Sequence, residues 1–451
     1  MDGQVEYRLA LIQPESRELL VVQNNKRSQL PRVVTTMGQR QVEQITQLVQ
    51  QKWGIRATVL EMFPETCSEG PCAVMEIQSL PSAWKDKALQ QVWFASIDSD
   101  VLIENERRNV NSLLSEDQSQ VSPLAHVGWI KDVQQWIRDS TQNSRLSFCD
   151  DVQQLNAGSG FALCRFCTHE GVTYWLKAVG HPNKHEFQVT RELATHLPNY
   201  LPRIIAMREE WNAWIMEDSG TPLSELFTLP QLERAVGSLA QLQIDSIEHI
   251  DRLRMAGCRD SSIAVLDAHL EEITEYLIDA MAKQTSSKVP RIESPRLREL
   301  ESVLRDACHK MQDLGIPDTL IHNDINAGNI LVSESHCVFI DWAEASIGNP
   351  FFTFQHICAQ IVRDSPDSAV WLLSAKRSYQ QTWSGRLSER QIDRACALMP
   401  ALGILSYLFG RGDWLGSALR NQPRFQGYAR TLARYIDRAS RMSEFREAIC
   451  L

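Results

Sequence analysis

Residues 322–342 read HNDINAGNILVSESHCVFIDW. Asp324 comes two positions after the histidine, Asn329 follows five positions later, and Asp341 comes after two short apolar runs separated by a polar turn. Such runs predict a β-hairpin, which would return Asp341 to the neighbourhood of Asn329. Two carboxylates and a carboxamide would then lie on one side of a small sheet. This set suits phosphoryl transfer, in which an acid accepts a hydroxyl proton and oxygen ligands hold Mg²⁺ on nucleotide phosphates.

The spacing H-x-D-x-x-x-x-N, followed by an aspartate in a D-W pair, resembles the catalytic segment of the aminoglycoside phosphotransferase-like small-molecule kinases. By this resemblance Asp324 is the catalytic base, and Asn329 and Asp341 are the Mg²⁺ ligands. The resemblance also implies ATP or GTP as the phosphate donor. It extends over about residues 145–451 and departs from the family pattern at Asn323, where glycine is frequent. An ordinary hairpin with acidic ends would use some of the same residue types.

Two features upstream predict the contacts to the nucleotide phosphates. Gly158, Ser159 and Gly160 follow a strand-like run, and glycines there would let backbone amides approach a phosphate. A G-S-G sequence is also common in plain hairpin turns. Lys177 lies inside the apolar run YWLKAV, where an inward-pointing lysine needs an anion. By the family resemblance, Lys177 contacts the α- and β-phosphates.

The helix predicted at residues 185–197 supplies the expected carboxylate partner of Lys177. Glu186 and Glu192 are both available. Glu186 shares the apolar, inward face of this helix, whereas Glu192 lies off that stripe. Glu186 is therefore the favoured partner. Further along, Glu217 ends a strand-like run that resembles the hinge between the two kinase lobes, and we include it among the nucleotide-binding residues.

Residues 1–105 are predicted to form a separate α+β accessory domain, with strands on either side of a helix at residues 40–54. The arrangement resembles a Nudix domain. The positions at which an active Nudix hydrolase carries its glutamates hold Leu48, Gln51 and Lys52, so the metal site of such an enzyme is missing. A different small α+β domain remains the alternative. In either case we expect a non-catalytic domain.

The chain as a whole is predicted to be α+β, with a bilobal protein-kinase-like fold after the accessory domain. Residues 106–126 are polar with few apolar anchors, which is typical of a linker. The β-rich N-lobe is expected at residues 127–220. The helical C-lobe, which contains the catalytic segment, is expected at residues 221–451 and by resemblance lines the pocket for the acceptor.

Composition limits the partners. The 451 residues include 43% hydrophobic ones and carry a net charge of −10, which disfavours nucleic acid because phosphate contacts need a basic surface. No signal peptide is visible, and no apolar run reaches the roughly 18 residues that span a membrane. Eleven scattered cysteines then indicate a cytoplasmic protein with reduced thiols. Cys164 and Cys167 would point to opposite faces of a strand, which favours a packing role over metal binding.

These observations predict a kinase that transfers the γ-phosphate of a nucleotide to a hydroxyl of a small molecule. The acceptor is an antibiotic such as an aminoglycoside, or a metabolite alcohol of the choline or homoserine type. A protein acceptor is disfavoured because no A-P-E element follows Asp341. A catalytically silent kinase fold that serves as a binding module is the alternative from another class. The oligomeric state is not predicted.

Overall fold

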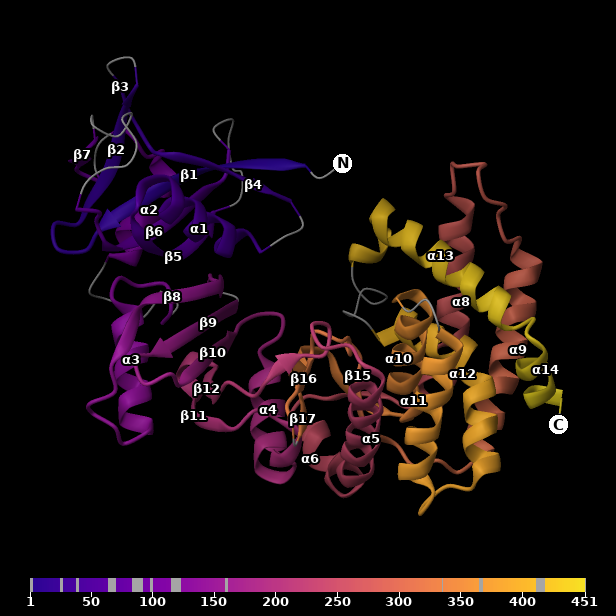
Figure 1. Ribbon diagram of the computed structural model, residues 1–451. Helices are drawn as coiled ribbons and strands as arrows, with labels where there is room; N and C mark the ends of the chain where they lie inside the picture. The colour runs from indigo at the N-terminus through magenta and orange to yellow at the C-terminus, as the bar shows by residue number, and fades with distance from the viewer. Residues whose placement is uncertain are drawn as a thin grey trace. The chain divides into compact units, whose positions relative to one another are not determined.

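In the computed structural model, the chain forms two compact units (Figure 1). Unit 1 comprises residues 1–187 and 203–218, and unit 2 comprises residues 188–202 and 219–451. The described residues are 3–24, 27–37, 40–63, 70–82, 92–97, 100–114, 123–158, 161–334, 336–364, 368–410 and 418–450. Both units mix helices with sheets, so the predicted α+β class is confirmed.

The first sheet of unit 1 is built from strands of the accessory domain. Its path runs in the order β3-β2-β1-β6-β5, with β4 also paired to β1 and β7 to β2. The pair β1 and β6 is parallel, and the other pairs are antiparallel. The strands are β1 (Gln4–Gln13), β2 (Glu18–Asn24), β3 (Arg27–Gln29), β4 (Arg32–Thr36), β5 (Arg56–Phe63), β6 (Cys72–Ser79) and β7 (Val92–Ala95).

Both faces of this sheet are buried. Successive strand residues point to opposite faces, so Leu9 and Leu11 of β1 join the core formed with helix α1 (Gln41–Trp53). Ala10 and Ile12 join a second core, formed with helices α2 (Glu104–Leu113) and α3 (Trp129–Ser140). A strand covered on both sides is continuously apolar, which explains the run of hydrophobic residues in β1.

Helix α2 corrects the expectation that residues 106–126 form a linker throughout. Residues 106–113 are helical, and Val110 and Leu113 are buried against the sheet. Glu106 is also buried, where it pairs with Arg8 of β1. Part of this helix is thus held by an ion pair instead of by apolar contacts, and this is why its composition resembles that of a linker. Residues 115–122 lie outside the described residues.

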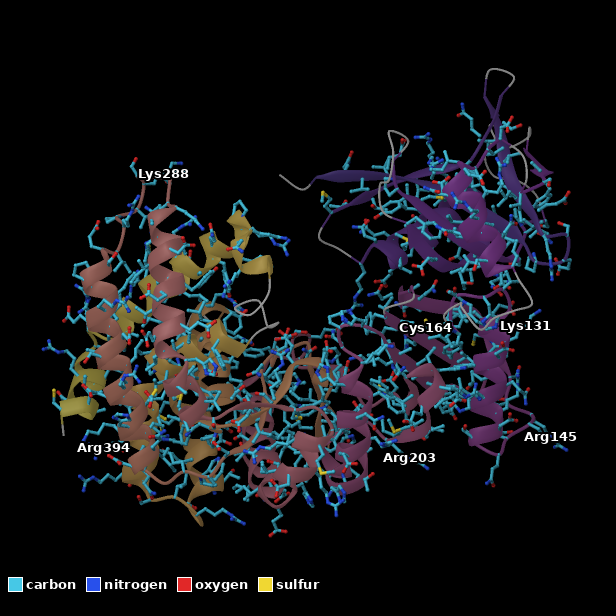
Figure 2. The ribbon with its side chains drawn as sticks, turned by 180° about the vertical axis from the view of Figure 1, so that it is seen from behind. Lys131, Arg145, Cys164, Arg203, Lys288 and Arg394 are labelled. Carbon is cyan, nitrogen blue, oxygen red and sulfur yellow. The ribbon has the colours of Figure 1, made fainter. Side chains whose placement is uncertain are left out.

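The second sheet of unit 1 is antiparallel, with the order β11-β12-β10-β9-β8. One face packs against α3, and Cys164 of β9 is fully buried there (Figure 2). Cys167 is only partly buried, as the predicted alternation of the two thiols requires. The strands are β8 (Phe148–Asn156), β9 (Phe161–Thr168), β10 (Thr173–Val179), β11 (Ile204–Arg208) and β12 (Ala213–Glu217). Helix α4 (His185–His196) lies between β10 and β11 in the chain.

Unit 2 is mainly helical and has one large apolar core. Two small sheets, β13-β16-β17 and β14-β18-β15, carry the catalytic segment. Their strands are β13 (Thr221–Pro222), β14 (Arg259–Ser261), β15 (Thr319–His322), β16 (Ile330–Val332), β17 (Cys337–Phe339) and β18 (Ala345–Gly348). The helices are α5 (Leu229–Ser246), α6 (Ile250–Met255), α7 (Ile263–Ala268), α8 (Leu270–Ala282), α9 (Ser294–Asp313), α10 (Phe351–Asp364), α11 (Ser368–Trp383), α12 (Glu389–Gly410), α13 (Pro423–Ala439) and α14 (Ser443–Cys450).

Helix α12 is long and apolar enough to cross a membrane by length and composition. Half of its most apolar window is buried, and Leu398, Leu402 and Leu405 belong to the core of unit 2. The apolar character of α12 therefore follows from its place among other helices.

Candidate functional site

The hairpin predicted from the catalytic segment is present in unit 2. Strands β16 and β17 pair antiparallel, with Ile330 opposite Phe339. The pairing continues as Ile340 N donates to the carbonyl of Asn329 at 3.0 Å. Asp341, the next residue, is thereby brought back beside Asn329, as the spacing of the sequence predicts.

The loop before the hairpin is fixed by its own side chains. The backbone carbonyl of Asp324 accepts hydrogen bonds from Asn326 Nδ2 at 3.0 Å and from Asn329 Nδ2 at 2.9 Å. Asn326 Oδ1 in turn accepts from Gly328 N at 2.8 Å. These bonds use the Asn329 amide nitrogen, so its Oδ1 is the atom that would bind a cation. Asn326 was not identified from the sequence, although an asparagine two positions after an aspartate in a loop is a turn-forming signal.

Neighbouring strands anchor this loop from behind. His322 Nε2 lies 2.9 Å from the carbonyl oxygen of Ile340, and its ring packs on Trp342 at 4.6 Å between centroids. Asn323 Nδ2 donates to the carbonyl of Glu344 at 2.9 Å and to Ser346 Oγ at 2.8 Å. At the position where glycine is frequent in the resembling family, Asn323 therefore ties the catalytic loop to β18.

The residues present fit a Mg²⁺ ion with few protein ligands. Asp341 has φ 69°, in the left-handed region that aspartate tolerates better than most residues. Asp324, Asn329 and Asp341 are all partly exposed, so their oxygens are accessible from solvent. Within the described ranges there is no cluster of three or more His, Cys, Asp or Glu side chains that could hold a metal. Mg²⁺ does not need one, because it commonly uses one or two protein oxygens together with substrate phosphates and water.

Unit 1 carries a second polar group on the face of its sheet opposite α3. Lys177 of β10 lies opposite Trp214 of β12 and forms an ion pair with Glu186 of α4. The Lys177 and Glu186 side chains are only 7% and 2% exposed. Lys177 Nζ also lies 5.7 Å from the centroid of the Trp214 ring. Glu192, the other glutamate considered from the sequence, instead lies 3.5 Å from His196.

We expect Glu186→Ala to lower the free energy of unfolding by about 3 kcal/mol, because it leaves a buried lysine without the carboxylate it pairs with. The matched control, Glu192→Ala, removes a partly exposed pair and should cost less than about 1 kcal/mol. Urea unfolding followed by fluorescence measures both values. Equal effects of the two substitutions would contradict the structural importance of the buried pair. Replacing both partners by apolar residues, Lys177→Met with Glu186→Leu, should restore most of the lost stability.

The other residues predicted to bind nucleotide are described only in part. Gly158 has φ 133°, a conformation that favours glycine, whereas Ser159 and Gly160 lie outside the described residues. The carboxylate of Glu217 accepts a hydrogen bond from Arg203 Nη1 at 2.9 Å. Arg203 is labelled in Figure 2. The roles of Gly158 and Glu217 in nucleotide binding remain predictions.

An apolar pocket of about 280 Å³ borders the catalytic segment in unit 2. Ala327 and Ile330 form part of its wall, and Phe227, which stacks on Trp371 at 5.0 Å between centroids, forms another part. Asp364 is the one carboxylate among the lining residues. The pocket therefore suits a ligand with an apolar surface better than one with several cationic groups.

The aspartate and asparagine side chains of unit 2 and the buried lysine–glutamate pair of unit 1 are groups of the kind that a nucleotide-dependent phosphotransferase uses. Residues 174–388 match the phosphotransferase enzyme family, APH, whose members are small-molecule kinases. This part of the chain is thus similar to that family, and the protein is an enzyme of the phosphotransferase class.

Solved structures of similar proteins include the macrolide 2′-phosphotransferase MphH from Brachybacterium faecium, with 16% identity and a TM-score of 0.43 over 67% of this chain and 98% of that one. A choline/ethanolamine kinase family protein from Mesorhizobium loti has 12% identity and a TM-score of 0.43 over 71% and 98% of the two chains. A GDP complex of an aminoglycoside 2′-phosphotransferase has 14% identity and a TM-score of 0.41 over 70% and 99%. Identities this low leave the acceptor undefined.

No curated protein matches the chain. The family match begins at residue 174, and none of the comparisons supports the resemblance of residues 1–105 to a Nudix domain.

Proposed function

We propose that the protein transfers the γ-phosphate of ATP or GTP to a hydroxyl group of a small molecule. The observation that carries the proposal is the hairpin of unit 2, which places Asp341 beside Asn329 at the end of the loop that holds Asp324. The family match supplies the reaction class, and the residues supply the roles.

In this proposal each group has one task. Asp324 accepts the proton of the acceptor hydroxyl as that oxygen bonds to the γ-phosphorus and the bond to the leaving nucleoside diphosphate breaks. Asn329 and Asp341 would hold Mg²⁺, which when bound offsets the charge of the phosphates. Lys177, oriented by Glu186, would bind phosphate oxygens, and the backbone at Gly158 would offer a further contact to them.

The acceptor we favour has an apolar portion as well as its hydroxyl. Support comes from the apolar pocket beside Ala327 and Ile330, which has a single carboxylate among its lining residues. A polycationic aminoglycoside would be better served by several carboxylates, since each buried ammonium group needs a partner. Hydroxyl-bearing antibiotics with an apolar body and small metabolite alcohols with one cationic group both remain candidates.

We expect Phe227→Ala to raise the KM for the acceptor about tenfold, which corresponds to about 1.4 kcal/mol of lost contact. An aromatic wall buries a large area against an apolar ligand, and this substitution removes the wall. The KM for the nucleotide should stay unchanged. The matched control is Leu226→Ala, because Leu226 is also exposed but does not line the pocket. Equal acceptor KM values for both variants would show that the pocket is not part of the acceptor site.

The direct test is transfer of labelled γ-phosphate from ATP and from GTP to a panel of acceptors. The panel holds aminoglycosides, macrolides and other hydroxyl-bearing antibiotics, choline, ethanolamine and homoserine, with Asp324→Asn as the inactive control. A labelled product that the control does not form establishes the activity and narrows the acceptor. A blank panel together with failure to bind any Mg²⁺-nucleotide would favour the silent binding module instead.

A further inference from the structure

In unit 1 the accessory domain contacts the second sheet through strands β5 and β8. Strand β5 ends the path of the first sheet, and strand β8 ends the path of the second. An exposed strand edge carries unpaired backbone groups that need partners. At this junction the partner is a side chain: Gln154 of β8 accepts from Val59 N at 2.7 Å and donates to the Val59 carbonyl at 2.8 Å. The Gln154 amide thus pairs with β5 as a backbone peptide would.

Further polar contacts surround this pair. Gln153 Nε2 donates to Glu43 Oε1 of α1 at 2.9 Å, and Arg56 of β5 lies 3.0 Å from Asp150 of β8. The Arg56 and Gln153 contacts are partly exposed, whereas Gln154 is 1% exposed. A buried amide with both ends bonded holds more firmly than exposed pairs, because breaking it leaves buried polar groups unsatisfied.

The junction leads directly into the glycine-rich loop. Two residues after Asn156, the end of β8, the chain reaches Gly158, and between them Ala157 packs against the apolar core that includes α1. A Cβ placed on Gly158 would lie only 3.2 Å from Glu61 Oε1 of β5. Glu61 also accepts a hydrogen bond from Met62 N at 2.9 Å, which fixes its carboxylate. Residues of the accessory domain therefore contact Gln154 and Ala157 and lie close to Gly158.

We propose that the accessory domain positions the end of β8 and Gly158 for phosphate binding, with Gln154 and Glu61 as the residues that hold this segment. This inference rests on the proposed function, because it assigns the loop at Gly158 to the nucleotide. A backbone segment that is already held in place loses less conformational freedom when the nucleotide binds, so the affinity of the protein for the nucleotide is higher. The accessory domain then acts on catalysis through nucleotide affinity, without contributing a catalytic residue.

The test compares Gln154→Asn with the matched control Gln153→Asn in the full-length chain. Each substitution shortens one of two adjacent glutamines at the same junction. Asparagine at position 154 is too short to bond both groups of Val59, so β8 loses its attachment just before the loop. We expect the Kd for Mg²⁺-ATP, measured by calorimetry, to rise about tenfold for Gln154→Asn and less than about twofold for the control. In the transfer assay the nucleotide KM should rise while kcat at saturating nucleotide is retained.

Hydrogen–deuterium exchange of residues 155–163 without nucleotide provides a readout that does not depend on the proposed function. We expect faster exchange there in Gln154→Asn and in Glu61→Ala, with Glu61→Gln close to the wild type because it keeps the size of the side chain. Glu61→Ala is the second variant in case Gln154→Asn fails to fold. Unchanged exchange in the folded variants would overturn the inference. If the wild type binds no nucleotide but exchange responds as expected, the proposed function fails while the coupling of domain to loop stands.

Discussion

Replacing Asp324 by asparagine is expected to lower phosphoryl transfer by about 10²–10⁴-fold, the usual contribution of a positioned general base. Asparagine has nearly the same shape as aspartate but cannot accept the proton of the acceptor hydroxyl. The loop should keep its conformation, because the bonds from Asn326 and Asn329 end on the backbone carbonyl of residue 324. Nucleotide affinity should therefore stay within about twofold of the wild-type value.

Steady-state rates of γ-phosphate transfer and calorimetric titration with Mg²⁺-ATP measure the two quantities separately. The matched control is Asp251→Asn in the same unit, because the Asp251 side chain is 96% exposed and forms a surface pair with Arg254. That variant should keep full activity. Near-normal turnover in Asp324→Asn would show that Asp324 is not the catalytic base, whatever the nucleotide affinity proves to be.

Replacing Asp341 by asparagine is expected to abolish the part of nucleotide binding that depends on Mg²⁺. In the wild type, nucleotide at a hundred times its Kd should add about 2.7 kcal/mol to the stability of the folded state. An asparagine side chain at this position would lack the negative charge that balances a divalent cation, so magnesium should no longer increase the stabilisation by nucleotide. Thermal unfolding with nucleotide, with and without Mg²⁺, measures the difference.

The choice of asparagine matters because of the backbone at this position. Asp341 has φ 69°, and for residues other than glycine, asparagine and aspartate such a conformation costs about 1–2 kcal/mol. Asp341→Ala should therefore lose the magnesium effect and also unfold at a lower temperature without any ligand. Asp341→Asn should lose only the magnesium effect. If Mg²⁺ still increased the stabilisation by nucleotide in Asp341→Asn, Asp341 would not be a metal ligand.

Local patterns account for what could be predicted correctly. The pairing of β16 with β17 follows from two apolar runs that are neighbours in sequence, so it needs no other part of the chain. The burial of Lys177 follows from its place inside an apolar strand. The pairing of Lys177 with Glu186 rather than with Glu192 follows from which face of α4 is apolar.

The features that could not be predicted depend on contacts between residues far apart in the chain. Helix α2 depends on the pair between Glu106 and Arg8, which are 98 positions apart. Nothing near Glu106 in the sequence indicates that its charge will be buried. The polar composition of this segment therefore cannot be distinguished from that of a linker. Asn323 is similar, because its two hydrogen bonds end at Glu344 and Ser346, and only the folded chain brings these residues to it.

The amino-acid sequence alone thus determined the reaction class and the residues proposed to perform it, because catalytic groups on one loop and hairpin have fixed spacings along the chain. Tertiary structure alone decided how the accessory domain joins the rest of unit 1. The pairing of Gln154 with Val59 joins residues 95 positions apart through a side chain that imitates a peptide group. Glutamine is common on protein surfaces, and only its burial against β5 gives this one a structural role.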